Sequence, residues 1–587
     1  MTNLLFLSPS SSNSSGLSMY SEDHDIPPNL HHSVSNSQRS DDSRTTKQEA
    51  EAVKGSSFKG GGYSPFAPER DAFSPHIPFE NSRLLLERTE IYTPDDRSLE
   101  LGSHKKSGVF LLWWNEFWYL VNKTLPIMAG GILQSMMPFI EVISLGHLGK
   151  SELAGMGLAH ILIVFSGYPL LFGVIGALET LGSQAFMGAA KHPFLTGIYL
   201  QRSILIGSVG FAILSLLWLN AQWALSLLQN DQAVLGFSSL YLRAYFSSFY
   251  ILFLLDCVKQ YLYAQGITYP IPFVQLIGCL ATILGQWILV WNQSTSLGFV
   301  GIPISMGLGY LAMLASLCLY IYKTDAKRCW NGWSLLSLKG WDQVMQLAIP
   351  GSLMTLGSSG ANELVSIGAA GLGTTSLAAQ SILTTTLRIA IIPNSYIGIV
   401  ASNRVGNLLG SQQAYQARMS AIAAQSATCI VALFGLFALT TFRVQWAAFF
   451  TNEPDVLATA VSLLPLVSVT MGCETFSTCL SGLLRGQGRQ PLAACIKLTS
   501  FYLLAAPIGY YTCFKFDQGL SGLWIGLLCG HGLTAIAEGI CIALTNWAHQ
   551  VDNCKRRLNS SSNAGYGTIS QPSTPPRALA ESIAPIP

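Results

Sequence analysis

Charged residues are scarce in this chain. Only 11% of its 587 residues are Asp, Glu, Lys or Arg, against roughly 25% in an average soluble domain, and 50% are hydrophobic. This composition excludes an ordinary soluble protein and indicates an integral membrane protein in a lipid bilayer. The net charge of +2 is close to neutral, so the composition gives no reason to expect a nucleic-acid partner.

Motifs that would mark an ATP-driven pump or an enzyme are also missing. The chain contains no Walker A string and no HExxH string, and the span residues His160 and His531 each stand alone. Its 12 cysteines begin at Cys257 and form no CxxC pair, so they are interpreted as small core residues and not as ligands or disulfides. We therefore expect no metal, no cofactor and no enzymatic activity.

The two ends of the chain differ in composition from the rest. Residues 1–107 are rich in Ser, Asn, Asp and Pro, and residues 551–587 resemble them. Neither segment has enough apolar surface to offset the entropy lost on ordering, so both are predicted to be disordered cytosolic tails. The apolar run at residues 4–7 is too short for a secretory signal.

Twelve apolar segments between these tails approach or exceed the length of about 20 residues that a transmembrane helix needs. A Trp-rich run at 109–121 is too short to span, so it predicts an interfacial helix before the first span. The predicted spans are 125–148, 155–187, 198–227, 234–262, 272–291, 298–322, 343–368, 376–400, 419–441, 456–484, 492–513 and 519–546. Lys and Arg gather in the loops on the N-terminal side, which places both termini in the cytosol. The sequon at Asn292 then falls outside.

The membrane part of the chain contains an internal sequence repeat. The string EVISLG at 141–146 returns as ELVSIG at 363–368, and QG at 265–266 returns at 487–488, always 222 residues later. Self-similarity at a fixed period is typical of a duplicated unit. Because each copy has an even number of spans, the two copies are parallel and related by an axis along the membrane normal. The predicted fold is all-α, with twelve transmembrane helices in two six-helix lobes (108–335 and 336–550).

Ionisable residues within the predicted spans are candidates for function, because each costs about 2.5–3.5 kcal/mol at a helix centre. Small and polar residues precede Glu363, which is typical of a helix that lines a cavity. For Glu363 and Glu474 we favour function over a structural ion pair with Lys497. Function and structure are equally balanced for Glu141 and for Asp256, which can pair with Lys259 or Arg243. The candidate coupling and substrate-binding residues are Glu141, Asp256, Glu363, Glu474 and Lys497.

Acids of this kind suit antiport. A carboxyl group in a low-dielectric cavity can hold a proton near neutral pH and release it when a cation arrives. Occupancy of one acid by either a proton or a cation, together with a shift between inward-facing and outward-facing populations, is the minimal device for exchange.

Five strings, taken in order, resemble signatures of the multidrug and toxic compound extrusion (MATE) family. They are ILQSMMPFIEVISLGHLGKSELAG, ALETLGSQAF followed by YLQRS, ASNRVGNLLG, LLRGQGRQP and GLWIGLL. The resemblance covers roughly residues 125–546. It implies two lobes around a central cleft, in a monomer that exports small organic cations, xenobiotics or metabolites in exchange for protons or Na⁺.

The resemblance also assigns residues. Glu363 and Glu474 match acids in the seventh and tenth spans of the family. A further set matches family signatures and is interpreted as structural or gating: Glu179, Gln184, Gln201, Arg202, Arg404, Asn407 and Arg485. The chain departs from relatives at Ser358-Ser359-Gly360 (Glu-Trp-Trp in many), at Thr385 (an acid in animal members) and at Lys497 (usually Asn). As a hypothesis, Lys497 neutralises Glu363 or Glu474 and admits a less cationic substrate.

Other functions remain open from sequence alone. They are Na⁺-coupled antiport, a lipid or organic-anion flippase of related fold, and a non-transporting receptor or enzyme, which would leave the duplicated acids unexplained. Residues 80–85 (ENSRLL) and 566–569 (YGTI) resemble sorting signals that adaptors read, so a vacuolar, other endomembrane or plasma-membrane location is expected.

Overall fold

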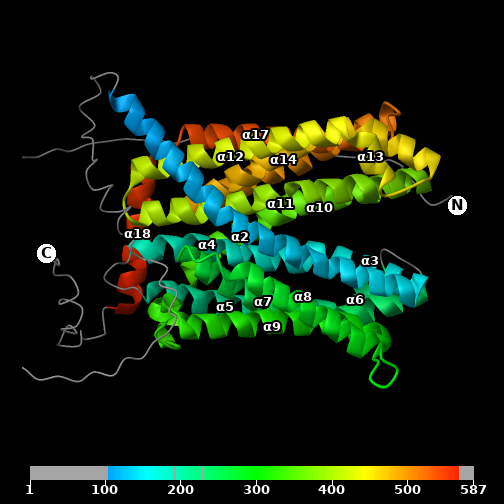
Figure 1. Cartoon of the computed structure of the whole chain (residues 1–587), viewed down its shortest axis with the longest axis horizontal. Coiled ribbons are helices and arrows are strands. Elements are labelled where there is room, and N and C mark those ends of the chain that lie inside the picture. Colours follow the sequence, from blue (N-terminus) through cyan, green and yellow to red (C-terminus); the bar gives the residue numbers. More distant parts are fainter. Residues whose placement is uncertain (1–103, 189–193, 227–230, 567–587) are drawn as a thin grey trace, which may run out of the picture. The chain divides into compact units, whose positions relative to one another are not determined.

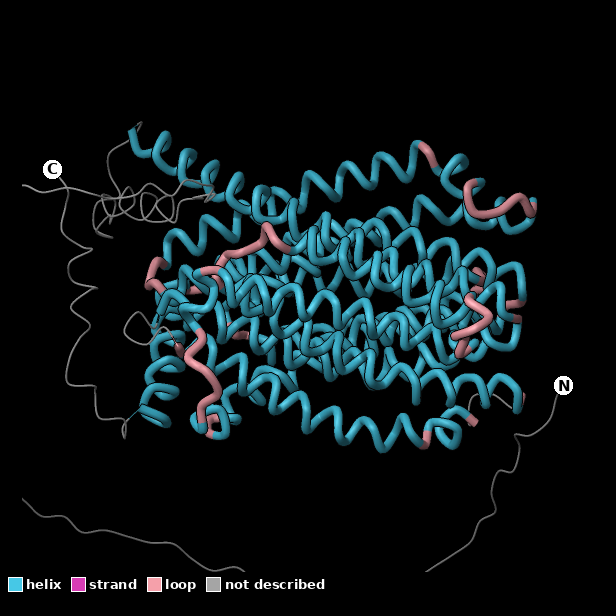
Figure 2. Tube along the Cα trace, turned by 60° about the horizontal axis from the view of Figure 1, so that its bottom comes forward, coloured by secondary structure: helices cyan, strands magenta, loops and turns pink. Residues whose placement is uncertain are grey.

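The computed structural model describes residues 104–188, 194–226 and 231–566. These residues are mainly helical and contain no strand, and the loops lie toward the two ends of the helix bundle (Figures 1 and 2). We call the end at which α2 begins and α18 lies the terminal side, and the other end the opposite side. Eleven helical segments of the described part have the length and apolar composition needed to cross a membrane.

The N-terminal lobe contains six transmembrane segments. They are α2 (His104–Leu148), the continuous segment α3–η1–α4 (Lys150–Leu162, Ile163–Gly167 and Tyr168–Gly188), α5 (Leu195–Leu219), α7 (Gln232–Ala264), α8–η2 (Ile271–Gln286 and Trp287–Trp291) and α9 (Gly301–Lys323). The short helices α6 (Ala221–Leu225), η3 (Gly298–Val300), η4 (Asp325–Cys329) and η5 (Leu335–Leu338) lie in the connections. Within this lobe, α8 packs against α9 and α2, while α7 packs against α9 and α3.

The C-terminal lobe repeats this arrangement. It contains α10 (Trp341–Gly371), α11 (Thr374–Gly410), α12 (Ala414–Thr441), α14 (Pro454–Gln487), the continuous segment α15–η6–α16–η7 (Gln490–Leu498, Thr499–Ala505, Ala506–Tyr510 and Tyr511–Lys515) and α17 (Leu520–Ala543). Short α13 (Arg443–Ala448) follows α12, and α18 (Trp547–Tyr566) ends the described chain. Helix α14 packs against α11, α12 and α17. Together the lobes form the predicted all-α architecture of twelve transmembrane segments.

Small residues allow the helices to pack closely, as expected where lipid removes the hydrophobic drive for helix association. A Cβ atom built on Gly526 of α17 would lie only 2.6 Å from Gly509 Cα of α16. Between the lobes, a Cβ on Gly351 of α10 would lie 3.2 Å from Gly173 Cα of α4. Backbone contact of this kind brings α4 of one lobe directly against α10 of the other.

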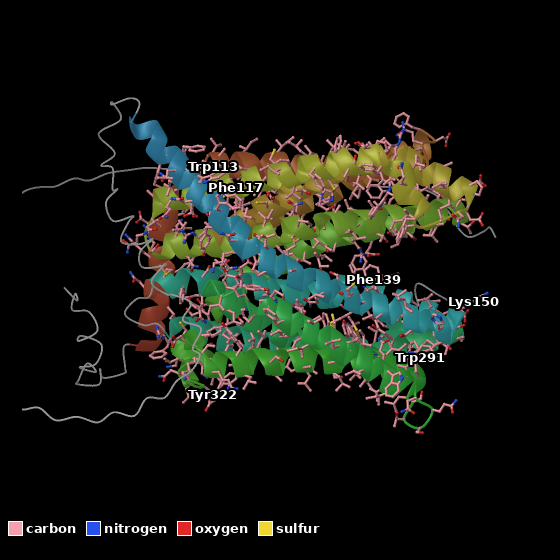
Figure 3. The ribbon with its side chains drawn as sticks, in the orientation of Figure 1. Trp113, Phe117, Phe139, Lys150, Trp291 and Tyr322 are labelled. Atoms are coloured by element: carbon pink, nitrogen blue, oxygen red, sulfur yellow. The ribbon has the colours of Figure 1, made fainter. Side chains whose placement is uncertain are left out.

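Aromatic side chains mark both ends of the bundle (Figure 3). Trp113, Phe117 and Tyr322 lie toward the terminal side, and Trp291 lies toward the opposite side, near Lys150. Tyr322 is 75% exposed and Trp291 is 47% exposed. Amphipathic rings of this kind favour the interfaces between membrane and water, so their positions are consistent with helices that cross a bilayer.

The structure corrects two boundaries predicted from the sequence. The predicted interfacial helix at 109–121 is not separate, because α2 runs unbroken for 45 residues. Residues 551–566, which were predicted to be disordered, belong to α18, and its buried residues Val551 and Cys554 explain why it is ordered. The N-terminal tail up to residue 103, the sorting sequence at 80–85 and residues 567–569 lie outside the described residues.

The predicted seventh span, 343–368, forms α10 but is not among the eleven apolar segments. The small and polar residues at 357–362 interrupt its apolar composition. Such residues are tolerated in a membrane where they face protein or an internal cavity.

Candidate functional site

Glu141 lies inside the N-terminal lobe. Its side chain leaves α2 toward α7, where the hydroxyl of Tyr241 donates a hydrogen bond to the carboxylate. The residue is 6% exposed, and Tyr241 stacks on Tyr245 with ring centroids 5.4 Å apart. Glu141 is therefore a buried acid with a single hydroxyl partner among the described residues.

We predict that Tyr241→Phe destabilises the N-terminal lobe by about 1–3 kcal/mol, because it leaves the buried Glu141 without its donor. The measurement is the midpoint of thermal unfolding in detergent, which should fall. Tyr245→Phe is the matched control, since it removes a neighbouring hydroxyl that does not contact Glu141. Equal midpoints for Tyr241→Phe and wild type would show that the hydrogen bond contributes nothing.

Asp256 forms an ion pair along its own helix. Its Oδ1 atom lies 2.6 Å from Lys259 Nζ, which also donates to Gln134 Oε1 at 3.1 Å. Gln275 of α8 donates to the same Gln134 oxygen at 3.0 Å. Of the two partners predicted for Asp256, the structure selects Lys259, while Arg243 donates instead to a backbone carbonyl of α5.

Glu363, the repeat equivalent of Glu141, has a different partner. Its carboxylate lies 3.4 Å from Arg388 Nη2 of α11. The Glu363 side chain is 15% exposed and that of Arg388 is 60% exposed, so this ion pair is open to solvent or ligand on one side. The other member of the predicted pairing, Lys497, interacts electrostatically with Glu474 and Glu538. In the described part of the chain Lys497 forms no ion pair within 4 Å with either acid, and Glu363 has Arg388 instead. The hypothesis that Lys497 neutralises Glu363 or Glu474 stays a prediction.

The interior of the C-terminal lobe holds four ionisable residues. Glu474 of α14 lies 3.8 Å from His531 of α17, measured from Oε2 to Nε2. Lys497 of α15 is 8% exposed, and Glu538 of α17 is fully buried and accepts from Ser481. Sequence analysis did not select His531 or Glu538 as candidates. Their spacing could have pointed to them. His531 and Glu538 are seven residues apart on α17, as Glu474 and Ser481 are on α14, so the two residues of each helix lie on one helix face.

An apolar cavity of about 300 Å³ lies between α10, the α15–η7 segment and α17. Val365 and Gly368 of α10 line it, close in sequence to Glu363. Phe501 lines it as well and meets His531 edge to face, with ring centroids 4.9 Å apart. The cavity is at the lower end of the size range of small-molecule sites, and its lining residues include no acid.

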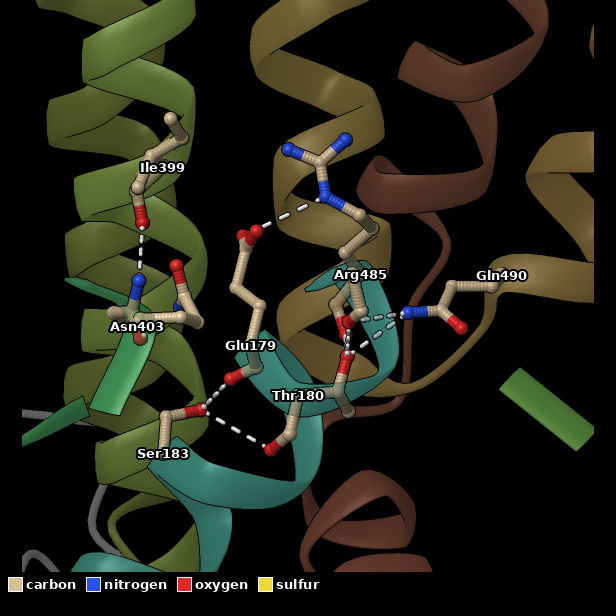
Figure 4. Close-up of polar contacts among 9 residues, drawn as sticks. Glu179, Thr180, Ser183, Ile399, Asn403, Arg485 and Gln490 are labelled. Atoms are coloured by element: carbon tan, nitrogen blue, oxygen red, sulfur yellow. Dashed lines mark hydrogen bonds and ion pairs between the residues drawn. The ribbon is translucent and has the colours of Figure 1, made fainter. Parts of the chain in front are cut away.

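The signature residues form the contact between the lobes on the terminal side (Figure 4). Glu179 of α4 lies 3.5 Å from Arg485 of α14. Thr180 donates to the Arg485 carbonyl at 2.7 Å, and Gln490 donates to Thr180 Oγ1 at 3.1 Å and to the Gly176 carbonyl at 2.9 Å. Gln184 donates to the Gly486 carbonyl at 2.9 Å. This hydrogen-bonded surface closes the terminal side of the interface.

The remaining signature residues hold the same side of the molecule together. Arg404 of α11 forms a two-point ion pair with Glu116 of α2, and Asn407 donates to the Ala264 carbonyl of α7 at 3.2 Å. Gln201 and Arg202 of α5 bond to backbone groups of the segment that joins the lobes. The predicted structural set therefore gathers on the terminal side, separate from the acids in the lobe interiors.

Comparisons with known proteins identify this architecture. The MatE family model matches residues 126–288 and 350–511, which are more than half of the chain. The chain belongs to the MATE family. An uncharacterized transporter of Schizosaccharomyces pombe is 30% identical over 449 residues, covering 76% of this chain and 83% of that protein. The protein DETOXIFICATION 15 of Arabidopsis thaliana is 27% identical over 445 residues, covering 74% and 90%.

The crystal structure of the eukaryotic MATE transporter AtDTX14 has the same fold, with a TM-score of 0.70 and 24% identity over 77% of this chain and all of that one. These matches confirm the predicted family and the predicted two-lobed, twelve-helix fold. The chain is thus a multi-pass MATE transporter of the membrane.

Proposed function

We propose that this MATE transporter exports organic cations, xenobiotics or metabolites in exchange for protons. The observation that carries the proposal is Glu474, whose side chain is 13% exposed and whose buried Oε2 atom has no hydrogen-bond partner among the described residues. A buried polar atom is normally satisfied, and a proton added to Glu474 lowers the cost of its burial. The apolar cavity beside Phe501 supports an organic substrate with an apolar body.

Protons fit the candidate acids better than Na⁺ does. Asp256 has Lys259 as its partner, Glu363 has Arg388, and Glu141 has a tyrosine hydroxyl. A sodium ion needs several converging oxygen ligands and would have to displace these donors, whereas a proton needs only one oxygen. Coupling through Glu363 and Glu474 of the C-terminal lobe therefore remains our assignment, with Glu141 as a second proton site.

Alternating access supplies the transport step. The interlobe hydrogen bonds and ion pairs gather on the terminal side, around Glu179, Arg404 and Arg485. We place this side in the cytosol on the basis of the Lys and Arg bias of its loops. We infer that this arrangement is the outward-facing member of the cycle and that inward opening requires these contacts to break.

The test is flux in reconstituted vesicles with ethidium, an aromatic cation, as the probe. A pH gradient imposed on wild type should drive uphill accumulation, whereas a Na⁺ gradient should not. Glu363→Gln cannot exchange a proton at this position and should lower pH-driven accumulation at least about tenfold. Glu453→Gln, an exposed acid of the same lobe, is the matched control. Retained uphill accumulation in Glu363→Gln would refute the assignment of Glu363 as a coupling site. Accumulation driven by a Na⁺ gradient would show that the coupling ion is Na⁺ and not the proton.

A further inference from the structure

We propose that a ladder of buried side chains between α14, α15 and α17 carries the coupling proton through the C-terminal lobe. We use "ladder" for Glu474, Ser481, Lys497, His531 and Glu538. The inference rests on the proposed proton coupling and adds to it a route, three further residues (Ser481, His531 and Glu538) and a role for Lys497.

The ladder has two rungs, each made by one residue of α14 and one of α17. Glu474 and His531 form the first rung, with 3.8 Å between Oε2 and Nε2. Ser481 and Glu538 form the second, with the serine hydroxyl 2.8 Å and 2.9 Å from the two carboxylate oxygens. Seven residues separate the rungs on each helix, which is about two turns, so both rungs lie along the same helix–helix contact.

The first rung is unsatisfied. Glu474 Oε2 and His531 Nε2 are both buried and have no hydrogen-bond partner among the described residues. Their separation is too long for a hydrogen bond, and leaving such groups unpaired costs about 1–3 kcal/mol each. A movement of about 1 Å would bring them to hydrogen-bond distance. Proton transfer then breaks the O–H bond of Glu474 and forms an N–H bond on His531, with no other reactant.

Lys497 comes from α15, which contacts both helices that form the rungs, α14 and α17. Lys497 is 8% exposed and in the described part of the chain has no ion pair within 4 Å, while the charges of Glu538 and Glu474 both act on it. A glycine of α10, Gly357, gives its stem room, since a Cβ there would lie 3.3 Å from Lys497 Cβ. A flexible lysine can pair with only one of the two carboxylates at a time, so the other must take a proton or stay without a cationic partner.

Charges on neighbouring elements face the same space. Arg388 of α11 acts on Glu474, and Arg485 of α14 acts on Glu538 and Lys497. Arg485 lies four residues after Ser481, one turn closer to the terminal side, and pairs with Glu179 of the other lobe. The ladder therefore runs from the lobe interior to a contact that must break when the terminal side opens, which links proton position to lobe closure.

The transport test separates proton movement from substrate movement. Glu538→Gln and His531→Asn should lower pH-driven ethidium accumulation at least about tenfold, because the proton loses its route. Both should leave ethidium exchange without a gradient within about twofold of wild type, since exchange needs no net proton transfer. Glu453→Gln is again the control. Wild-type levels of pH-driven accumulation in both variants would overturn the ladder, whereas absent flux in wild type would instead refute the proposed function.

A second measurement needs no transport. The infrared carbonyl band of protonated carboxyl groups is recorded on purified protein from about pH 5 to pH 9. We expect Glu474→Gln and Glu538→Gln each to remove part of the titrating band. Lys497→Met should increase the band at neutral pH by removing the shared cation, and Lys497→Arg should restore it. A band that none of these substitutions changes would overturn the proposal, and elution as a single folded species excludes unfolding as the cause.

Discussion

Replacing Glu116 by Gln should destabilise the closed terminal side by about 3–5 kcal/mol, because it leaves Arg404 without its charge partner in a largely buried site. Arg404 donates to Glu116 through Nη2 at 2.6 Å and through Nε at 3.0 Å, the two-point geometry that makes such pairs strong. The side chain of Glu116 is 4% exposed and that of Arg404 is 22% exposed. Gln416 of α12 donates to the same carboxylate and would lose a charged acceptor.

Thermal unfolding and hydrogen exchange measure this effect. The unfolding midpoint of Glu116→Gln should fall, and backbone amides of α11 near Arg404 should exchange faster. The double variant Glu116→Gln with Arg404→Gln is the control, because removing both charges leaves no buried ion and should recover most of the loss. If the single variant unfolds at the wild-type temperature, this ion pair does not hold the lobes together.

The Glu116–Arg404 pair also explains why the predicted interfacial helix was wrong. The Trp-rich run at 109–121 is too short to span by itself, and sequence analysis therefore separated it from the first span. In the structure it is the first part of α2, and the carboxylate at its centre points to α11 of the other lobe. A hydropathy pattern records length and polarity along one chain, and it contains no information on a partner 288 residues away.

The fold could be predicted from the sequence, whereas the partners of the candidate acids could not. Apolar length and the 222-residue repeat are properties of the sequence, and they led to twelve spans in two lobes. The partners of the acids depend on which way each helix faces, and helices that are apolar on most sides give a weak rotational signal. Glu141 and Glu363 therefore matched in sequence yet differ in the structure, one facing a tyrosine and the other an arginine.

Helix α18, like the unbroken helix α2, was not predicted from the sequence. It lies across the terminal-side ends of both lobes (Figure 1). Its residue Arg557 contacts both lobes. The guanidinium donates to Gln184 Oε1 of the N-terminal lobe at 3.1 Å and to the Gln487 and Gly488 carbonyls of the C-terminal lobe at 3.1 Å and 3.4 Å. The polar, Ser-rich composition of this segment predicted disorder. That prediction was wrong because composition gives no information on an arginine that bridges two lobes.

We predict that Arg557→Ala weakens the docking of α18 by about 1.5–3 kcal/mol, the range expected when hydrogen bonds to a charged group are lost. Cys554 reports this change, because it is a fully buried residue of α18 and burial raises the pKa of its thiol to about 11. Thiol reagents attack the thiolate, so wild type should react slowly at this position. Release of α18 would expose Cys554 and lower its pKa, and labelling measured by peptide mass spectrometry should accelerate at least about tenfold.

The sign of the change distinguishes release from a local charge effect. The positive charge of Arg557 itself lowers the pKa of Cys554, opposing the larger effect of burial. If α18 stays docked in Arg557→Ala, loss of that charge should raise the pKa further, and labelling should be slower than in wild type. Arg556→Ala is the matched control, since Arg556 is exposed on the same helix. Faster labelling in Arg557→Ala alone would show that one side chain fastens α18 across both lobes, and slower labelling would show that apolar packing holds it.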